Sequence, residues 1–454
     1  MTVHVFTGPT IPADDVHHLL PDAVCHPPVS HGDLLRLGLA RTDIALIIDG
    51  LWHQTAPIRH KELLAVMATG VRVVGAASMG ALRAAELAPY GMLGVGRVYE
   101  SYASGALEAD DEVAVLHTPE GHKITEALVN MRTAIDRATT AGRLGRTDAQ
   151  ALLELARSLP YTRRTWKALG YAAEEASLTC AFDAVNSWRQ THPYDLKRAD
   201  AEEALAILLR GLPAPARTAP WRGERWQTSF VRYWTAAFQP DRTGIPLLAL
   251  LQHQQLYDPR FPARWRQRVL ANIGREHSGL PEEAALTAAR EAGTSTTDLS
   301  PAQRAHWFTS DEERLLDPGE GLRRIMVRSA RLDGAWTVWP ATHAEALPLL
   351  DTDLDTEQRV AHAFRVNDAA QANNPRHTPA HLDAGRITTH LLSHWGLPTD
   401  ADQETRDAAA RDRAFRDFVG AVETCRAYYL GARAAEVTSD PSAPSGTGAV
   451  MLRT

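Results

Sequence analysis

The sequence predicts an α/β protein, with an N-terminal parallel-sheet (Rossmann-like) domain followed by a mainly α-helical C-terminal region. Short apolar runs alternate with helical patterns over roughly the first hundred residues, which is typical of a parallel sheet. One run, IALII at residues 44–48, is apolar throughout, as expected of a central strand that is covered on both faces. Beyond residue 220 the pattern is helical and rich in tryptophan and arginine.

The predicted elements of the first domain follow one another in a regular order. The strands are expected at residues 4–7, 23–25, 44–48 and 71–77, and the helices at residues 14–20, 32–40, 60–69 and from Ser78 to Leu87. Because ligands of parallel sheets bind beyond the carboxyl ends of the strands, a site is expected at that edge. The residues predicted to lie there are Thr7, Gly8, Asp49, Gly50, Trp52, His53 and Ser78.

The most informative stretch is VVGAASMGALRAAEL, residues 73–87. Its valines favour a strand and its alanines and leucines favour a helix, so Ser78 is predicted at the helix N-cap. The free amides and the dipole of a helix start also favour an anion or a developing oxyanion. Small flanking residues resemble a nucleophile elbow, although G-x-S-x-G is not met because Ala76 replaces the first glycine. Ser78 is therefore either a nucleophile or only a helix cap.

A serine nucleophile needs a general base. His60 and Lys61, at the start of the preceding helix, are the nearest candidates in the predicted topology, although such a pair is also common on a surface. Asp49, at the end of a buried strand, would either orient the base or cap a loop.

The remaining candidate residues would bind the anion or the substrate. The main-chain amides of Met79 and Gly80 would face an oxyanion, with Gly8 at the same edge. Arg83 would hold a carboxylate, or else form an ion pair with Glu86 one turn later. The loop at residues 51–59, which carries Trp52 and His53, would form the wall of a groove leading to Ser78.

Composition limits the class of protein. A chain of 454 residues with 44% hydrophobic and 23% charged residues is globular and suggests about two or three domains. The formal net charge of −7 argues against a general nucleic-acid binder. Three scattered cysteines without a CxxC pair indicate neither a disulfide framework nor a zinc site. Neither a signal peptide nor a membrane span is visible, so we expect a soluble, cytoplasmic protein that needs no metal and no other cofactor.

The later part of the chain gives weaker signals. The acidic cluster at residues 110–112 would bind magnesium or form a solvated turn. Amphipathic helices are expected at residues 122–143, 146–157, 171–189 and 200–210. The proline-rich stretch 211–220 is the expected linker. The segments after it are rich in arginine and tryptophan, and we expect the arginine side chains to pack on the tryptophan rings rather than to bind nucleic acid. The predicted divisions are residues 1–135 (α/β domain), 136–211 (helical extension), 221–435 (helical C-terminal domain) and 436–454 (disordered tail).

Several runs in the first 135 or so residues resemble the TfuA family: GPT, IIDG, HKELL, GVRVVGAASMGALRAAEL, GMLGVGRVYESY and DDEVAVLH, with YDLKRADAEEAL as a later and less diagnostic element. The resemblance implies a role in peptide backbone thioamidation, beside a YcaO-type ATP-dependent enzyme that activates the peptide substrate. It also implies release of sulfide from a thiocarboxylated, ubiquitin-like (ThiS-like) sulfur-carrier protein.

Two other functions remain open. The protein would instead be a non-catalytic adaptor that recruits the sulfur carrier or the peptide to the YcaO-type enzyme. A nucleotide-binding α/β domain ranks last, because no Walker lysine pattern is present.

Overall fold

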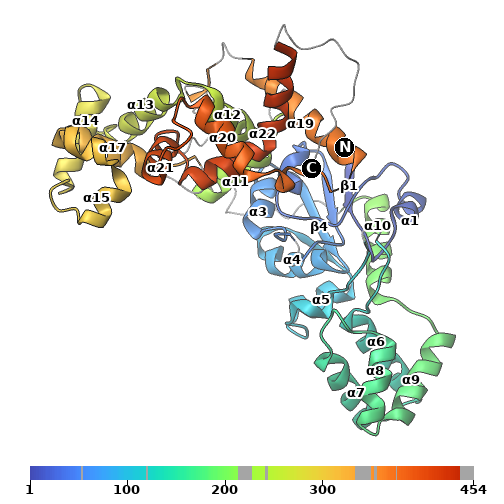
Figure 1. Ribbon diagram of the computed structural model, residues 1–454. Helices are drawn as coiled ribbons and strands as arrows, with labels where there is room; N and C mark the ends of the chain where they lie inside the picture. Colours follow the sequence, from blue (N-terminus) through green and yellow to red (C-terminus); the bar gives the residue numbers. More distant parts are fainter. Residues whose placement is uncertain are drawn as a thin grey trace. The chain divides into compact units, whose positions relative to one another are not determined.

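The computed structural model describes residues 1–52, 55–118, 121–212, 228–240, 244–332, 349–351, 355–374 and 376–439. The chain divides into two compact units, Met1–Trp226 and Gln227–Thr454, and each is described by itself (Figure 1).

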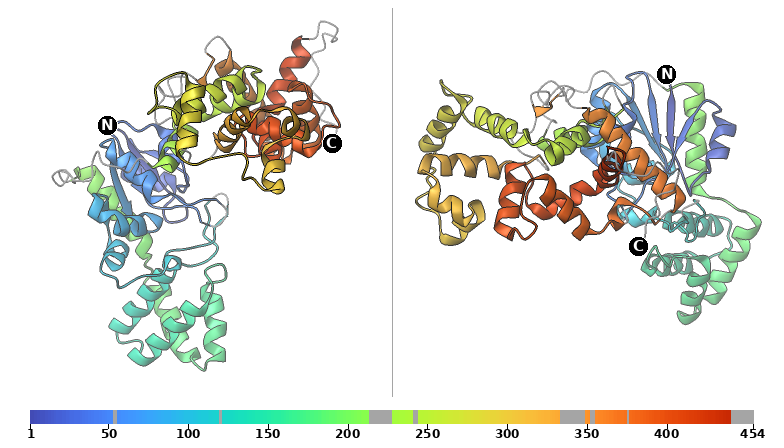
Figure 2. Two further views of the ribbon diagram at one scale, coloured as in Figure 1. Left: turned by 90° about the vertical axis from the view of Figure 1, so that its left-hand side faces the viewer. Right: turned by 45° about the horizontal axis from the view of Figure 1, so that its top comes forward.

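The first unit is built on a sheet of five parallel strands in the order β2-β1-β3-β4-β5. The strands are β1 (Val3–Phe6), β2 (Val24–His26), β3 (Ile44–Ile47), β4 (Arg72–Ala76) and β5 (Leu93–Val95). The right-hand view of Figure 2 shows the strands side by side with helices around them. This confirms the predicted parallel sheet. The fifth strand was not predicted, because Gly94 and Gly96 interrupt the apolar pattern there.

Helices connect the strands, as expected of parallel pairing. They are α1 (Ala13–Leu19), α2 (Asp33–Leu37), α3 (His60–Ala68) and α4 (Met79–Leu87), with α5 (Arg97–Ala103) after the last strand. All of β3 is buried, which agrees with its fully apolar sequence.

Helix α10 (Leu196–Arg210) returns to the sheet from far along the chain (Figure 1). Its Ala201, Ala204 and Leu205 are wholly buried in one cluster with Val5 of β1 and Leu46 of β3. The helical extension predicted at residues 136–211 therefore belongs to the same compact unit as the sheet.

Between α5 and α10 the chain forms a group of helices with its own small core. They are α6 (Leu128–Thr140), α7 (Arg146–Ser158), α8 (Trp166–Glu175) and α9 (Thr179–Thr191). The single helix predicted at residues 171–189 is wrong, because the chain breaks after Glu175 and Ser177 takes a left-handed φ of 60°. The helix predicted from residue 122 begins only at Leu128.

In the second unit, the named elements among the described residues are helices, as predicted. They are α11 (Ser229–Phe238), α12 (Leu247–Tyr257), α13 (Phe261–Ile273), α14 (Pro281–Glu291), α15 (Pro301–Trp307), α16 (Ser310–Leu315), α17 (Pro318–Ser329), α19 (Thr356–Asn373), α20 (Ala384–His394), α21 (Gln403–Asp412) and α22 (Phe418–Ser439), with a short 3₁₀ turn at Pro379–His381. Helix α22 continues into the segment predicted as a tail. Residues 440–454, and all but the start of the predicted linker, lie outside the described residues.

Helix α12 contributes to both cores of the second unit. Its Leu248 and Leu251 pack in the cluster around Trp265, whereas Leu250 and Leu256 pack in the cluster around Tyr428, so the leucines of this helix are buried in two different directions. Among the described residues, no helix combines the length and the apolar character that crossing a membrane requires.

A candidate active site at the carboxyl edge of the sheet

The connection from β4 to α4 is a strained three-residue turn. The amide of Ser78 donates to the carbonyl of Ala76 at 2.7 Å, and Ala77 between them has a φ of 66°. A turn closed over three residues with a positive φ is rare for a residue with a side chain. Strain of this kind is concentrated at functional sites. It places Ser78 directly at the carboxyl edge of the sheet and at the start of a helix.

Two glycines allow α4 to begin this close to the strands. A Cβ atom on Gly80 would lie 1.8 Å from the carbonyl oxygen of Ile47, and one on Gly75 would lie 2.1 Å from the carbonyl oxygen of Gly80. The amide of Gly80 donates to the carbonyl of Ile48 at 3.2 Å. The prediction that this amide faces an oxyanion is therefore wrong, because it already has an acceptor.

The side chain of Ser78 is not used as a cap. Ser78 occupies the N-cap position of α4 but its hydroxyl accepts no amide hydrogen bond, so the predicted capping role is wrong in this respect. The residue is 6% exposed, and no hydrogen bond joins its hydroxyl to another residue of the described part. The main-chain amides of Met79 and Gly8 likewise make no hydrogen bond to a described residue. A hydroxyl and an amide thus remain available at the start of α4.

Asp49 follows β3 at the same edge and is 2% exposed. Its carboxylate accepts hydrogen bonds from the amide of Thr10 at 3.0 Å and from the hydroxyl of Thr10 at 2.6 Å. A Cβ on Gly8 would lie 3.7 Å from this carboxylate. Asp49 therefore fixes the loop after β1, which is the simpler of the two predicted roles, and it also places a buried negative charge at the edge.

Lys197, in the first turn of α10, is the residue that the sequence alone did not single out. Its side chain is 3% exposed and its Nζ donates to the carbonyl of Val113 at 2.9 Å. Burial lowers the pKa of its ammonium, and the charge of Asp49 acts in the opposite direction. A buried amine with a lowered pKa gives up its proton more readily than an exposed lysine, and a general base must be deprotonated to act.

The start of α10 and the first turns of α4 contribute to one hydrophobic cluster. Leu196 packs in one cluster with Ala81 and Leu82 of α4, and Trp52 packs against the same cluster. Asp49 acts electrostatically on Lys197, and Asp49 and Ser78 follow the paired strands β3 and β4 at the carboxyl edge of the sheet. Trp52 is half-buried against this cluster, whereas His53 lies outside the described residues.

The other candidate bases lie elsewhere. The Nε2 atom of His60 is 2.7 Å from the carboxylate of Glu86, at the far end of α4 from Ser78, and Lys61 is exposed. Arg83 pairs with Glu86 at 2.7 Å, so of its two predicted roles the structure shows the ion pair. A helix rises about 1.5 Å per residue, and Glu86 is therefore about 12 Å along the axis from Ser78. Neither His60 nor Lys61 is therefore placed by the structure beside Ser78.

The acidic cluster forms ion pairs. Asp111 contacts Arg164 at 2.7 Å and Glu112 contacts Arg132 at 2.6 Å. Over the residues that the structure describes, no group of three or more His, Cys, Asp or Glu side chains could hold a metal ion. The magnesium site considered for residues 110–112 is therefore not formed.

The family comparison coincides with this edge. Residues 49–165 match the family model of TfuA-like proteins. No curated protein matches the chain. The matched segment begins at Asp49 and contains Ser78 and Val113, but it ends before Lys197.

Proposed function

We propose, because residues 49–165 match the family model of TfuA-like proteins, that the chain is a hydrolase that releases sulfide from the thiocarboxylated C-terminus of a sulfur-carrier protein. The observation that carries this proposal is the unused hydroxyl of Ser78, in a strained turn at the start of a helix, at the same edge as Asp49, whose carboxylate acts on the buried amine of Lys197. This combination has the parts of a nucleophile and its base.

The chemistry follows from these parts. Ser78 Oγ attacks the thiocarboxylate carbon while its proton passes to the neutral amine of Lys197. The resulting tetrahedral oxyanion collapses, the carbon–sulfur bond breaks, and the sulfide leaves with a proton from the Lys197 ammonium as hydrosulfide. Water then attacks the serine ester, again with Lys197 as base, and releases a carboxylate on the carrier and free Ser78.

Main-chain amides supply the stabilisation of the oxyanion. The amide of Met79 at the first turn of α4 has no acceptor among the described residues, and the helix dipole adds to its effect. The amide of Gly8 lies in the loop that Asp49 fixes and is the second candidate donor. One such donor is typically worth about 10²–10³ in turnover.

The proposed partners follow from the substrate. A ubiquitin-like carrier presents a flexible C-terminal tail, which would reach Ser78 along the wall that contains Trp52. The released sulfide would serve a YcaO-type ATP-dependent enzyme that has activated a peptide amide. An adaptor without catalysis is the competing function, and the same assay separates the two.

The test is sulfide release by the purified full chain from a thiocarboxylated carrier, without the YcaO-type enzyme. We expect Ser78→Ala and Lys197→Met each to lower the rate by at least about a thousandfold while leaving carrier binding intact. Lys61→Met, which removes an exposed lysine of the same unit, is the matched control and should keep the wild-type rate. Carrier binding without sulfide release by the wild type would establish the adaptor and end the hydrolase proposal.

A further inference from the structure

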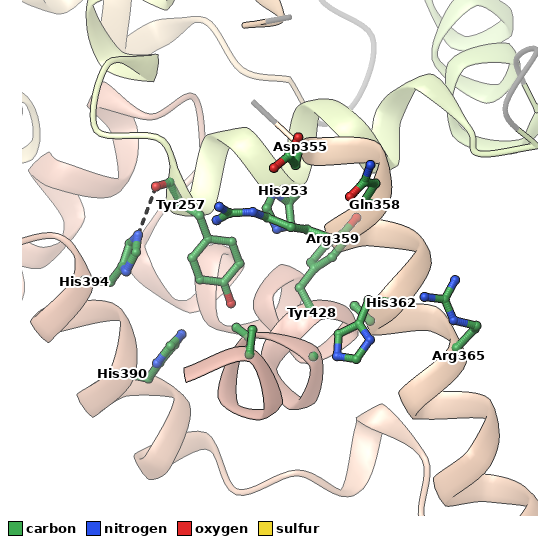
Figure 3. Close-up of a pocket in the computed structure, with 14 residues that line it drawn as sticks. His253, Tyr257, Asp355, Gln358, Arg359, His362, Arg365, His390, His394 and Tyr428 are labelled. Carbon is green, nitrogen blue, oxygen red and sulfur yellow. Dashed lines mark hydrogen bonds between the residues drawn. The ribbon is translucent and has the colours of Figure 1, made fainter. Parts of the chain in front are cut away.

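The second unit contains a cavity of about 590 Å³, which lies outside the segment that matches the family. Helices α12, α19, α20 and α22 line it, as Figure 3 shows. Its volume lies within the range of about 300–1,000 Å³ that is usual for small-molecule sites. Its lining combines arginine, histidine and tyrosine side chains, which raises the question of what chemistry it recognises.

Positive charge at the cavity has no counter-ion among the residues that the structure describes. Arg359 and Arg365 of α19 both line it, and neither forms an ion pair or a side-chain hydrogen bond with a described residue. Other arginines of this unit are paired, for example Arg266 with Glu320 at 2.8 Å and Arg328 with Glu312 at 2.7 Å. Asp355 is the one carboxylate among the described lining residues, and no ion pair between it and either arginine is found among those residues. The cavity therefore favours an anion.

The inner wall consists of rings. His253 is 8% exposed and lies against Tyr257 and Tyr428, with ring centroids 5.0 and 5.8 Å away. Burial, together with the charges of Arg359 and His394, lowers the pKa of His253 to about 4, so the ring is neutral at pH 7. Figure 3 shows the guanidinium of Arg359 close to His253 and Tyr257. An anionic group on Arg359 would thus lie next to a neutral aromatic surface.

We propose that this cavity binds a small organic anion, in which a phosphate or carboxylate group pairs with Arg359 and a flat ring packs against His253 and Tyr257. Arg365 adds positive charge on the same helix, and Tyr428 forms the far side of the ring wall. Arginine suits either oxyanion because its planar fork matches both. The site is independent of the proposed hydrolase, since its lining residues all belong to the second unit.

Calorimetric titration of the full chain with four probes tests this. Phenyl phosphate and benzoate carry a ring and an anion, inorganic phosphate only the anion, and benzyl alcohol only the ring. We expect phenyl phosphate or benzoate to bind with one-to-one stoichiometry, at least about tenfold more tightly than either partial probe. The stronger of the two identifies the headgroup as phosphate or carboxylate.

Matched variants complete the test. Arg359→Gln should weaken binding of the stronger probe at least about tenfold, whereas Arg359→Lys, which keeps the charge, should weaken it less. Arg386→Gln, on exposed α20 surface outside the lining, removes the same charge and should leave binding unchanged. Equal losses in Arg359→Gln and Arg386→Gln, or no saturable binding of any probe up to about 10 mM, would overturn the proposal. Circular dichroism of each variant establishes that it is folded.

Discussion

At the scale of single residues, Lys197 has the most unusual environment in the candidate site. An amine removed from water loses hydration in its charged form, so burial lowers its pKa. The hydrogen bond to the carbonyl of Val113 keeps its nitrogen in place, and the carboxylate of Asp49 limits the shift. Such a lysine suits proton transfer better than an exposed one.

Sulfide release should rise with pH as Lys197 loses its proton. Because burial lowers the pKa of Lys197, this rise should be complete below the pKa of about 10.4 of a free lysine. Rates measured between pH 5 and 9 check this, with Lys61→Met keeping the profile. A rate that is independent of pH over this range would exclude Lys197 as the base.

Ser78→Ala should hardly change stability. Ser78 makes no capping hydrogen bond, so its removal should cost less than about 0.5 kcal/mol, whereas a capping residue costs about 0.5–2 kcal/mol. Thr165→Ala is the matched comparison, because the Thr165 side chain accepts from the amide of Ala168 at 3.0 Å. Urea unfolding of both variants measures the difference. A larger loss in Ser78→Ala than in Thr165→Ala would show that Ser78 has a structural role.

At the scale of elements, the junction between β4 and α4 depends on close backbone packing. Gly80→Ala should destabilise the first unit by about 3 kcal/mol or more, because its Cβ would overlap the carbonyl oxygen of Ile47 and backbone must move. Gly145→Ala is the control, since its Cβ would meet nothing nearer than 3.9 Å and its φ is −71°. Thermal unfolding compares them, and similar melting temperatures would show that α4 can shift at no cost.

The first turn of α5 is held by a carboxylate of α10. Asp200 of α10 accepts hydrogen bonds from the amides of Arg97 at 3.0 Å and Val98 at 2.7 Å, and burial raises the pKa of its carboxyl to about 6. A raised pKa means that its contribution to stability is complete below the unfolded pKa of about 3.9 and is lost as pH rises through 6.

The free energy of unfolding of the wild type minus that of Asp200→Asn should therefore be larger at pH 5 than at pH 7, because the asparagine does not titrate. Denaturant unfolding at the two pH values measures it, and all other titrating groups are common to both proteins. A difference that grows from pH 5 to pH 7 would contradict the raised pKa.

At the scale of the whole molecule, the first unit contains all the parts of the candidate active site. A fragment of residues 1–212 should fold and release sulfide, because it retains Ser78, Asp49 and Lys197. A fragment of residues 1–165 should be unstable, since the removal of α10 exposes the apolar face that Ala204 and Leu205 cover. Calorimetry and the sulfide assay on both fragments check this. An inactive but folded 1–212 fragment would show that the second unit is needed for catalysis.

The sequence by itself determined the parallel sheet and the position of Ser78. Both depend on preferences of a few neighbouring residues, namely apolar runs that favour strands and helix-forming residues that follow them. The β-branched run before Ser78 and the alanines after it specify a strand followed directly by a helix. The TfuA resemblance also depends on such local runs, and the family match confirms it.

Tertiary structure decided which side chains meet. Lys197 is buried against Val113 only because α10 packs on the sheet through Ala201 and Leu205, a contact that no local sequence pattern predicts. The amide of Gly80 donates to the carbonyl of Ile48 because α4 begins close to the strands. His60 and Arg83 both pair with Glu86 because α3 packs near α4. Hydrogen-bond partners and burial are properties of the packed chain, and they are the reason why we propose Lys197 as the base in place of His60 or Lys61.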